Sequence, residues 1–423
     1  MFHEHRCRLP YLIPALVVWF ACCGGLAFAQ DEWPQFRGPN GQGHANVTSA
    51  PTSWSETENI TWKADIPGSG FSSPVISGDR IWLTTALDEG HSLHALCIDR
   101  ASGDIVQNVK VFAELNPPKI NVTNSYASPT PVIDGDRVFV CFGTMGTACL
   151  NSVTGEVLWR NHELVLDHKE GPGSSPIVVD DLLILNCDGQ DVRYVAALDK
   201  RTGEIAWKAD RSVPPASNMD MNKAYSTPLL IEANGRRELV SPGAMHVAAY
   251  DPATGDELWK VLYPQGFSNV PRPVFGDDLL FVSTGYVRAT LLAIRPGGNG
   301  DVTETNVAWS SDRQAPTRPS PIYVDGRLYV ASDRGVLTCY EAATGETLYT
   351  ERLGGSFASS PIYAAGHIYF CNEKGETTVI KASRTFELVS KNELPAPIKA
   401  SPAAVGKEIY VRTTEALYRI EGQ

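Results

Sequence analysis

A short motif recurs eight times along this chain of 423 residues and constrains its fold more than any other feature. Each copy has Ser, Thr or Arg before Pro, then a β-branched or aliphatic run, a tight polar turn and a second β run. The spacing of about 47 residues is close to that of one four-stranded propeller blade. The eight steps are Ser73-Pro74, Thr130-Pro131, Ser175-Pro176, Thr227-Pro228, Arg272-Pro273, Ser320-Pro321, Ser360-Pro361 and Ser401-Pro402. The repeat predicts an all-β, eight-bladed propeller, or a seven-bladed one if one unit is degenerate.

The strands of one unit are visible in residues 321–349. Four runs of four or five residues, rich in Tyr, Val and Leu, are separated by turns that contain Asp and Gly. Asp325-Gly326 separates the first two runs, and Ala343-Thr344-Gly345 separates the last two. Short runs bounded by such turn residues are typical of antiparallel strands.

A second signature, Ala-x-Asp-x-x-Thr-Gly-x-x-x-Trp, marks the outer half of the units. In this signature we expect Asp and Thr to close a turn, Gly to adopt a backbone conformation closed to other residues, and Trp to pack between blades. A near match begins at Asn151 and ends at Trp159. The two complete copies consist of Ala197, Asp199, Thr202, Gly203 and Trp207, and of Ala249, Asp251, Thr254, Gly255 and Trp259.

The two ends of the repeat region complement each other. The last unit has no outer strand after Tyr418, whereas 59–65 reads as an isolated outer strand with Trp62 in the position of the signature Trp. Pairing the two would close the ring and remove an open sheet edge. We therefore expect 59–423 to form the propeller and 30–58 to be an extension that packs on the ring.

The first 29 residues have the composition of a signal peptide. Arg6 and Arg8 precede an apolar run at 12–20, and Ala27-Phe28-Ala29 is a small-x-small cleavage site. The rival interpretation is a lipid anchor at Cys22 or Cys23, but the preceding residues fit the lipidation pattern poorly. We expect export to a periplasm or the cell exterior as a soluble protein.

Charge and hydropathy exclude several classes of protein. The chain has 36 Lys and Arg against 48 Asp and Glu, and its net charge of −12 argues against nucleic-acid binding. Hydrophobic residues are 43% of the chain, too many for a wholly disordered one. Beyond the signal region, no apolar run reaches the ~18 residues of a transmembrane helix.

The Trp signature and the eight-fold count resemble the quinoprotein alcohol dehydrogenase-like superfamily, whose propellers carry pyrroloquinoline quinone (PQQ) repeats. The resemblance covers nearly all of the chain after the signal region. The opening Trp33-Pro34-Gln35-Phe36-Arg37-Gly38-Pro39 is similar to that of exported PQQ-like propellers of the planctomycete type. The chain is also similar to the BamB-like propellers of the outer-membrane β-barrel assembly machinery. The resemblance implies a propeller but leaves the function open, because it includes both enzymes and scaffolds.

The enzymes of the superfamily hold PQQ and Ca²⁺ at the ring centre, often beneath a disulfide between adjacent cysteines. The only adjacent cysteines here, Cys22 and Cys23, lie in the predicted signal peptide, and the chain has no Cys-x-x-Cys-His haem motif. We therefore predict no cofactor and no catalytic residue, with PQQ and Ca²⁺ as the alternative.

The remaining six cysteines are Cys97, Cys141, Cys149, Cys187, Cys339 and Cys371. Three of them align with the small Ala of the Trp signature, which indicates buried hydrophobic side chains rather than metal ligands. A disulfide between Cys141 and Cys149, which flank a turn, is left open. His91-x-x-His94 has metal-ligand spacing only on a helix, and it lies in a predicted strand; we predict no metal site.

Long connections between blades, at 107–128, 161–173, 210–226 and 310–319, should emerge together on one face of the ring. Loops on a rigid scaffold commonly carry function. A basic and aromatic set near the mouth of the channel would favour an anionic ligand or an acidic peptide, unless its members pair with acidic neighbours. Asp167 and Glu170 are a weak candidate for a catalytic carboxylate pair. The candidate ligand-binding residues are Lys223, Tyr225, Arg272, Arg318, Phe357 and Lys399.

Together these features predict a monomeric, non-enzymatic exported scaffold that binds a protein or polymer partner of the cell envelope through its interblade loops. The alternative is a PQQ- and Ca²⁺-dependent dehydrogenase of alcohols or sugars.

Overall fold

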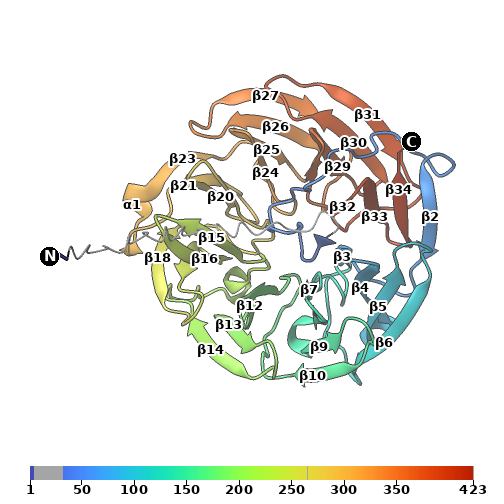
Figure 1. Ribbon diagram of the computed structural model, residues 1–423, viewed down its shortest axis with the longest axis horizontal. Helices are drawn as coiled ribbons and strands as arrows, with labels where there is room; N and C mark the ends of the chain where they lie inside the picture. Colours follow the sequence, from blue (N-terminus) through green and yellow to red (C-terminus); the bar gives the residue numbers. More distant parts are fainter. Residues whose placement is uncertain (4–31, 264, 423) are drawn as a thin grey trace.

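The structure is a computed structural model that describes residues 1–3, 32–263 and 265–422. Eight β-sheets, each built on antiparallel strands, stand around a central axis like the blades of a propeller (Figure 1). This confirms the all-β, eight-bladed prediction. Apart from its first three residues, the predicted signal peptide lies outside the described residues.

Each blade has four strands, which follow chain order from the centre outwards in blades one to seven. Blades one to four contain β3 (Val75–Ser77), β4 (Arg80–Leu87), β5 (Ser92–Asp99), β6 (Ile105–Ala113); β7 (Val132–Asp134), β8 (Arg137–Cys141), β9 (Thr147–Asn151), β10 (Val157–Asn161); β11 (Ile177–Val179), β12 (Leu182–Asp188), β13 (Arg193–Asp199), β14 (Ile205–Asp210); and β15 (Leu229–Ala233), β16 (Arg236–Gly243), β17 (His246–Tyr250), β18 (Glu257–Leu262).

Blades five to eight follow the same plan. They contain β19 (Val274–Gly276), β20 (Leu279–Ser283), β21 (Leu291–Ile294), β23 (Val307–Ser311); β24 (Ile322–Val324), β25 (Arg327–Ala331), β26 (Val336–Glu341), β27 (Thr347–Arg352); β28 (Ile362–Ala364), β29 (His367–Cys371), β30 (Glu376–Lys381), β31 (Leu388–Glu393); and β32 (Ala403–Val405), β33 (Glu408–Arg412), β34 (Ala416–Glu421), β2 (Ile60–Asp65). The additional elements are β1 (Glu32–Trp33), β22 (Gly300–Asp301), α1 (Thr303–Asn306), η1 (Asp88–Gly90), η2 (Gly143–Met145) and η3 (Met219–Asn222).

The eighth blade joins the two ends of the repeat region. Strand β2 pairs antiparallel with β34, so residues near the start of the propeller supply the outer strand of its last blade. Trp62 stands opposite Arg419 in this pairing. The sheet is thereby completed to four strands like its neighbours.

Antiparallel order gives the ring two different faces. The loop face carries the connections between blades and the turns between the second and third strands. The turn face carries the turns between the first and second and between the third and fourth strands. These turns are short, except in blade five, where β22 and α1 lie between β21 and β23 and β22 pairs with β18 of the preceding blade.

On the turn face, a Trp of one blade docks on the third-to-fourth-strand turn of the next. The indole of Trp159 donates to the carbonyl of Lys200, and a Cβ on Gly203 would lie 2.5 Å from the Trp159 ring. The same contact joins Trp62, Trp207 and Trp309 to the turns that contain Gly103, Gly255 and Gly345. The packing of each of these Trp rings therefore depends on a glycine in the next blade and on the turn that holds this glycine against the ring.

The turn itself is closed as the signature predicts. The Asp199 carboxylate accepts hydrogen bonds from the backbone N–H groups of Arg201 and Thr202, at 2.8 and 3.0 Å. Gly203 has a φ of +78°, in the left-handed region that favours glycine. The Thr202 hydroxyl accepts from the backbone of Glu204. These local bonds fix the shape of the platform on which Trp159 packs.

At the loop-face end of the innermost strands, the Ser or Thr of each Ser/Thr-Pro step links adjacent blades. Its hydroxyl accepts a hydrogen bond from the backbone N–H of the corresponding residue in the preceding blade. We term these contacts the hydroxyl ring, and their N···O distances are 2.9–3.0 Å. Written with the backbone donor first and the hydroxyl acceptor second, they join residues 73 and 130, 130 and 175, 175 and 227, 272 and 320, 320 and 360, 360 and 401, and 401 and 73. The backbone N–H of Thr227 has no such acceptor in this set, because the fifth step has Arg272 instead of a residue with a hydroxyl group.

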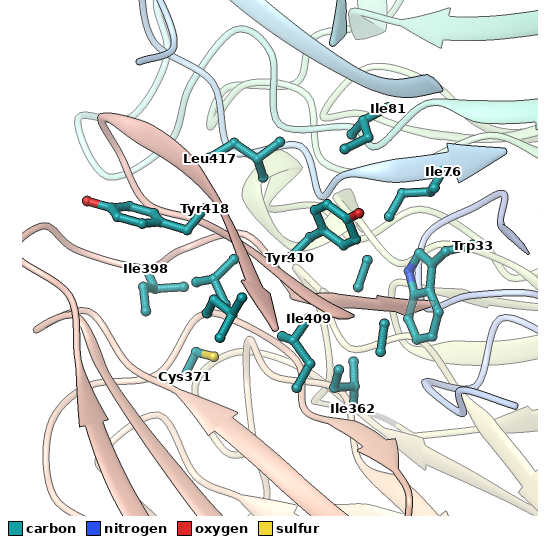
Figure 2. Close-up of a cluster of buried hydrophobic side chains, with 14 of the residues drawn as sticks. Trp33, Ile76, Ile81, Ile362, Cys371, Ile398, Ile409, Tyr410, Leu417 and Tyr418 are labelled. Carbon is teal, nitrogen blue, oxygen red and sulfur yellow. The ribbon is translucent and has the colours of Figure 1, made fainter. Parts of the chain in front are cut away.

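Buried hydrophobic clusters fill the spaces between neighbouring blades. The largest joins blades seven, eight and one, and it includes Trp33 of the N-terminal extension. Figure 2 shows Trp33 beside Ile76 and Ile362, which come from the innermost strands of blades one and seven. The extension is thus part of the core.

The six cysteines after the signal region are buried and have free thiols. The disulfide left open between Cys141 and Cys149 does not form, because the pairing register places Cys141 opposite Thr147 and Cys149 opposite Phe139. Burial raises the pKa of the Cys149 thiol to about 11 and that of Cys371 to about 12. These thiols are protonated near neutral pH and behave as small apolar side chains, as the sequence predicts.

Candidate functional site

Large exposed apolar side chains lie on the outer strands at the rim of the ring and on the loops of the loop face. On the loop face, seven large apolar side chains of the interblade connections and second-to-third-strand turns are at least 37% exposed. They extend as an arc over blades one to five. On the short turns of the turn face, among the described residues, Val153 alone is large, apolar and exposed. We term the set the loop-face arc: Leu115, Val122, Val165, Met219, Val270, Tyr286 and Val287.

A cleft of about 510 Å³ opens at the blade-five end of this arc. Its walls are mainly polar. They include Gln265, Arg288 and Arg313 and the hydroxyl residues Thr290 and Ser310. Arg288 forms an exposed ion pair with Asp312 at 3.2 Å.

Lys223, which the sequence placed at the mouth of the channel, is buried and neutralised. Its Nζ lies 3.2 Å from a carboxylate oxygen of Glu170 and 3.3 Å from one of Asp220. The Lys223 side chain is only 3% exposed. Asp220 also pairs with Lys169 and accepts a hydrogen bond from Gln190. This cluster ties the connections that precede and follow blade three to each other.

Tyr225 and Phe357 are buried as well. The Tyr225 hydroxyl donates to the carbonyl of His168 at 2.6 Å, and burial raises the pKa of the phenol well above its ordinary value. Phe357 lies in the cluster between blades six and seven. Both side chains support the loops rather than line a site.

Arg318 and Lys399 are the two predicted site residues that remain partly exposed. Arg318 pairs with Asp333 at 3.1 Å and with Glu373 at 2.9 Å. The Lys399 ammonium lies 4.4 Å from the centre of the Phe71 ring and donates to the carbonyl of Thr123. The six predicted residues therefore do not form one open basic ring.

The weak candidate pair Asp167 and Glu170 is also engaged. The Asp167 carboxylate accepts from the backbone of Lys169, and Glu170 accepts from Asn121 and Lys223. Both carboxylates are therefore tied to neighbouring groups of the loops.

The centre of the ring contains the N-terminal extension. Strand β1 pairs with β3, and the carbonyl of Pro34 accepts from Ile133 of blade two. Farther along, Gln42 accepts from the backbone of Phe275 in blade five at 2.6 Å. His44 contacts the carbonyl of Tyr323 in blade six at 2.6 Å. Residues 32–45 thus cross the channel and touch innermost strands on opposite sides (Figure 1).

Arg272 is the anchor of this extension. Its Nη1 donates to the carbonyl of Phe36 at 2.6 Å, its Nη2 to the side-chain oxygen of Gln35 at 3.3 Å, and its Nε to the carbonyl of Pro228. The step that departs from Ser or Thr in the repeat is therefore the step that holds the extension. The sequence marked Arg272 as a ligand-binding candidate, and the structure places it inside the channel.

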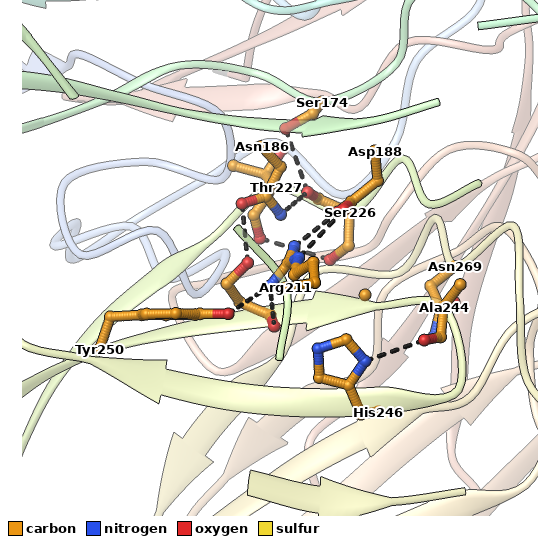
Figure 3. Close-up of polar contacts among 12 residues, drawn as sticks. Ser174, Asn186, Asp188, Arg211, Ser226, Thr227, Ala244, His246, Tyr250 and Asn269 are labelled. Carbon is orange, nitrogen blue, oxygen red and sulfur yellow. Dashed lines mark hydrogen bonds and ion pairs between the residues drawn. The ribbon is translucent and has the colours of Figure 1, made fainter. Parts of the chain in front are cut away.

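A buried polar network lies between blades three and four (Figure 3). Arg211 forms two hydrogen bonds with the Asp188 carboxylate, at 3.0 and 2.5 Å, and donates to the Tyr250 hydroxyl at 3.2 Å. Burial opposes the charge of Arg211, but Asp188 and Tyr250 more than offset it and raise the pKa of the guanidinium. Both charged side chains are 0% exposed, so they are closed to a substrate.

The side chains at the ring centre include two cationic ones. Ca²⁺ is held by oxygen ligands such as carboxylates, carbonyls and water. The channel instead holds the guanidiniums of Arg37 and Arg272, and the carboxylates of Glu170 and Glu373 nearer the mouth are bonded to cationic side chains. Across the described ranges, no group of three or more His, Cys, Asp or Glu side chains is placed to hold a metal ion.

Sequence reasoning missed the role of Arg37, Gln42 and His44. For Arg37 the signal was the opening motif at 33–39, which marked a resemblance but did not reveal where the segment lies, and Gln42 and His44 follow that motif in the chain. The described residues also contain no helix that is both long and apolar enough to span a bilayer.

Comparisons with known proteins agree with this architecture. The chain is similar to the crystal structure of BamB from Moraxella catarrhalis, with a TM-score of 0.61 at 13% identity, covering 86% of this chain and 97% of that one. It is similar also to a europium-containing methanol dehydrogenase, with a TM-score of 0.56 at 11% identity, covering 92% and 91% of the two chains. These likenesses concern the fold alone.

In sequence, the chain is 23% identical to a tetrathionate hydrolase of Acidithiobacillus ferrooxidans over 332 residues, which are 71% of this chain. The chain spans 62% of the length of that relative. The family described as outer membrane protein assembly factor BamB matches residues 94–294 and 243–417, which together cover most of the propeller. The chain therefore belongs to this family of PQQ-like β-propeller repeat proteins.

Proposed function

We propose that this protein is an exported, non-enzymatic scaffold that binds a protein partner of the cell envelope through the loop-face arc. The observation that carries the proposal is the difference between the loops of the two faces: the loop face carries the loop-face arc, whereas on the turns of the turn face Val153 is the one large exposed apolar side chain among the described residues. Exposed apolar residues grouped on one face mark interaction sites, whereas isolated ones are ordinary. The description of the family as an assembly factor supports a protein rather than a polymer as the partner.

The arrangement of the ring supports the same proposal. The channel is crossed by residues 32–45, and the charged groups around its mouth bind one another. A rigid ring with engaged polar groups and exposed apolar loops suits a docking platform, because binding then costs little conformational entropy. The apolar anchors lie over blades one to five, so we expect a partner to contact this part of the loop face and to leave blades six to eight uncovered.

Two valines of nearly equal exposure test the proposal. Val165 lies in the arc and is 60% exposed, and Val153 lies on the turn face and is 62% exposed. A photo-crosslinking residue at position 165, in cells that produce the protein, should yield one discrete protein adduct that is absent when the residue is at position 153. The adduct is then identified and the partner purified.

With that partner in hand, Val165→Asp should weaken binding at least about tenfold, as loss of a central apolar anchor does, and Val153→Asp should leave it unchanged. Equal adducts at both positions would refute a one-sided interface. An adduct that resists protease and contains carbohydrate would identify a polymer as the partner instead.

The non-enzymatic part of the proposal has a separate test. PQQ with Ca²⁺ should leave the melting temperature of the purified protein unchanged and support no dye reduction with alcohols or sugars. Incubation with tetrathionate should release no product, although the relative named above is a tetrathionate hydrolase. A Ca²⁺-dependent rise in melting temperature together with substrate-dependent dye reduction would replace the scaffold with a quinoprotein dehydrogenase.

A further inference from the structure

Two arginines at the ring centre are buried without a counter-charge. Arg37 of the N-terminal extension is 0% exposed and Arg272 of blade five is 2% exposed. Within residues 1–3, 32–263 and 265–422, the ion pairs include neither of them, although the chain has 48 acidic residues. Buried charges are normally paired, because an isolated charge in a medium of low dielectric constant is very costly.

The hydrogen bonds of the pair are incomplete. Arg37 donates from Nη2 to the carbonyl of Gln42 at 2.8 Å, while its buried Nε and Nη1 have no partner. Arg272 donates only to neutral acceptors, the oxygens of Pro228, Phe36 and Gln35. These acceptors orient the guanidinium of Arg272 but do not cancel its charge.

The backbone of the extension is shaped to hold the two guanidiniums. A Cβ on Gly41 would lie 2.4 Å from Nη1 of Arg272, and a Cβ on Gly43 would lie 2.6 Å from Nη2 of Arg37. Both glycines have positive φ, +71° and +86°. The turn Gly41-Gln42-Gly43 therefore lies against both arginines, and only glycine allows so close an approach.

Arg37 and Arg272 do not lose their charges by deprotonation. Arginine keeps its proton in proteins, since its ordinary pKa is above about 12. Burial lowers the pKa of Arg37 to about 9, with a contribution from the charge of Arg272, and burial alone lowers that of Arg272 to about 9. Both values remain above neutral pH, so the core holds two like charges, and that of Arg272 lies near enough to lower the pKa of Arg37.

We infer that the ring centre binds a small inorganic anion, a halide or an oxyanion, between Arg37 and Arg272. The anion supplies the missing counter-charge and accepts hydrogen bonds from the unpartnered Nε and Nη1 of Arg37. It thereby couples the N-terminal extension to blade five. Water could accept the same hydrogen bonds, but it would leave the repulsion between the two guanidiniums in place.

The direct test uses anions that scatter X-rays anomalously. Crystals of the full-length mature protein are grown in sodium gluconate, whose anion is too large for a buried site, and then transferred to sodium bromide or to sodium selenate. An anomalous peak between the two guanidiniums in bromide identifies a halide site, and one in selenate identifies an oxyanion site. The absence of a peak in both salts would show that the space holds water alone and would overturn the inference.

A solution measurement requires no crystal. The melting temperature is followed as sodium bromide or selenate replaces gluconate at constant ionic strength. We expect it to rise with a saturable dependence on the anion, by RT ln(1 + [L]/Kd) in free energy. Arg37→Met keeps the length of the side chain and removes the charge. Arg201→Met, at an exposed position on the turn face, is the matched control.

The two substitutions should give opposite patterns. The control should keep the full anion-dependent rise, whereas Arg37→Met should lose it and should melt no lower than the wild type in gluconate, because an unpaired buried charge has been removed. If Arg37→Met fails to fold, Arg272→Lys is the second variant. It keeps the positive charge at position 272 but changes the geometry of the hydrogen-bond donors, and it should weaken the anion dependence of the melting temperature. A rise of equal size in the wild type and in Arg37→Met would refute the site, because it would reflect general salt effects on the surface.

Discussion

The two faces of the ring are built by different means. The turn face repeats one local device, in which an Asp-Thr-Gly turn offers a glycine platform to the Trp of the preceding blade, as Gly203 does for Trp159. On the loop face, the hydroxyl ring is the repeated contact and lies at the ends of the innermost strands, whereas the Lys223 cluster, the Asp188–Arg211 pair and the apolar arc each occur once. Repetition therefore sets the architecture, and individual residues on the loops of the loop face are available for function.

The largest expected effect comes from the buried pair near the loop face. Asp188→Asn leaves Arg211 buried without its counter-charge, and we expect a loss of about 3–5 kcal/mol in the free energy of unfolding. Denaturation by urea measures it. Asp136→Asn, at a side chain that is 77% exposed on the turn face, is the control and should change little. A loss below 1 kcal/mol in Asp188→Asn would show that this network does not hold blades three and four together.

On the turn face, the corresponding test concerns Trp207. The Trp207→Ala substitution removes a ring packed on Gly255 and a hydrogen bond to the carbonyl of Pro252, and we expect a loss of about 2–4 kcal/mol. Ile205→Ala, on the same outer strand and 37% exposed, is the control and should cost clearly less. Equal losses in the two variants would mean that docking on the next blade contributes nothing beyond ordinary burial.

The loop face should also make the stability of the protein depend on pH, through His246. Burial and the charge of Arg211 lower the pKa of His246 to about 3, although its contact with the carbonyl of Ala244 opposes this shift. The unfolded chain binds a proton near pH 6.5 and the folded one does not, so the contribution of His246 to stability is full above pH 6.5 and falls as the pH drops towards 3. Between pH 6.5 and 5 we expect a loss of about 2 kcal/mol.

The measurement is the difference between the wild type and His246→Gln across this pH range. The variant should lack that part of the slope, and His91→Gln, at an exposed histidine, should keep it. Parallel curves for the wild type and His246→Gln would show that His246 is protonated in the folded protein.

The smallest expected effect concerns the hydroxyl ring. Ser360→Ala removes the acceptor for the buried N–H of Ser320, and we expect a loss of about 1 kcal/mol. Ser310→Ala, at an exposed side chain, should be neutral. Equal stability of Ser360→Ala and the wild type would mean that the ring of hydroxyls accompanies the Pro steps without stabilising the contact between blades.

The candidate site was less accessible to sequence reasoning than the fold. Lys223 and Arg318 were expected at an open mouth. Asp220, one partner of Lys223, lies in the same connection, but Glu170 and Glu373 come from another connection and another blade, and the sequence does not show such pairs. Arg272 could be recognised as an exception to the Ser/Thr-Pro pattern. Its role in holding the extension could not, because Phe36 lies 236 residues away in the chain.

The sequence by itself determined the number of blades, the short turns and the Trp docking, because each depends on residues within one repeat or on the same positions in the next repeat. The tertiary structure alone decided what occupies the centre of the ring and which loop residues remain exposed. Those outcomes depend on closing the circle, which brings residues 32–45 against innermost strands of blades far apart in the chain. Burial and charge pairing there arise from long-range contacts, and only the folded ring brings the groups together.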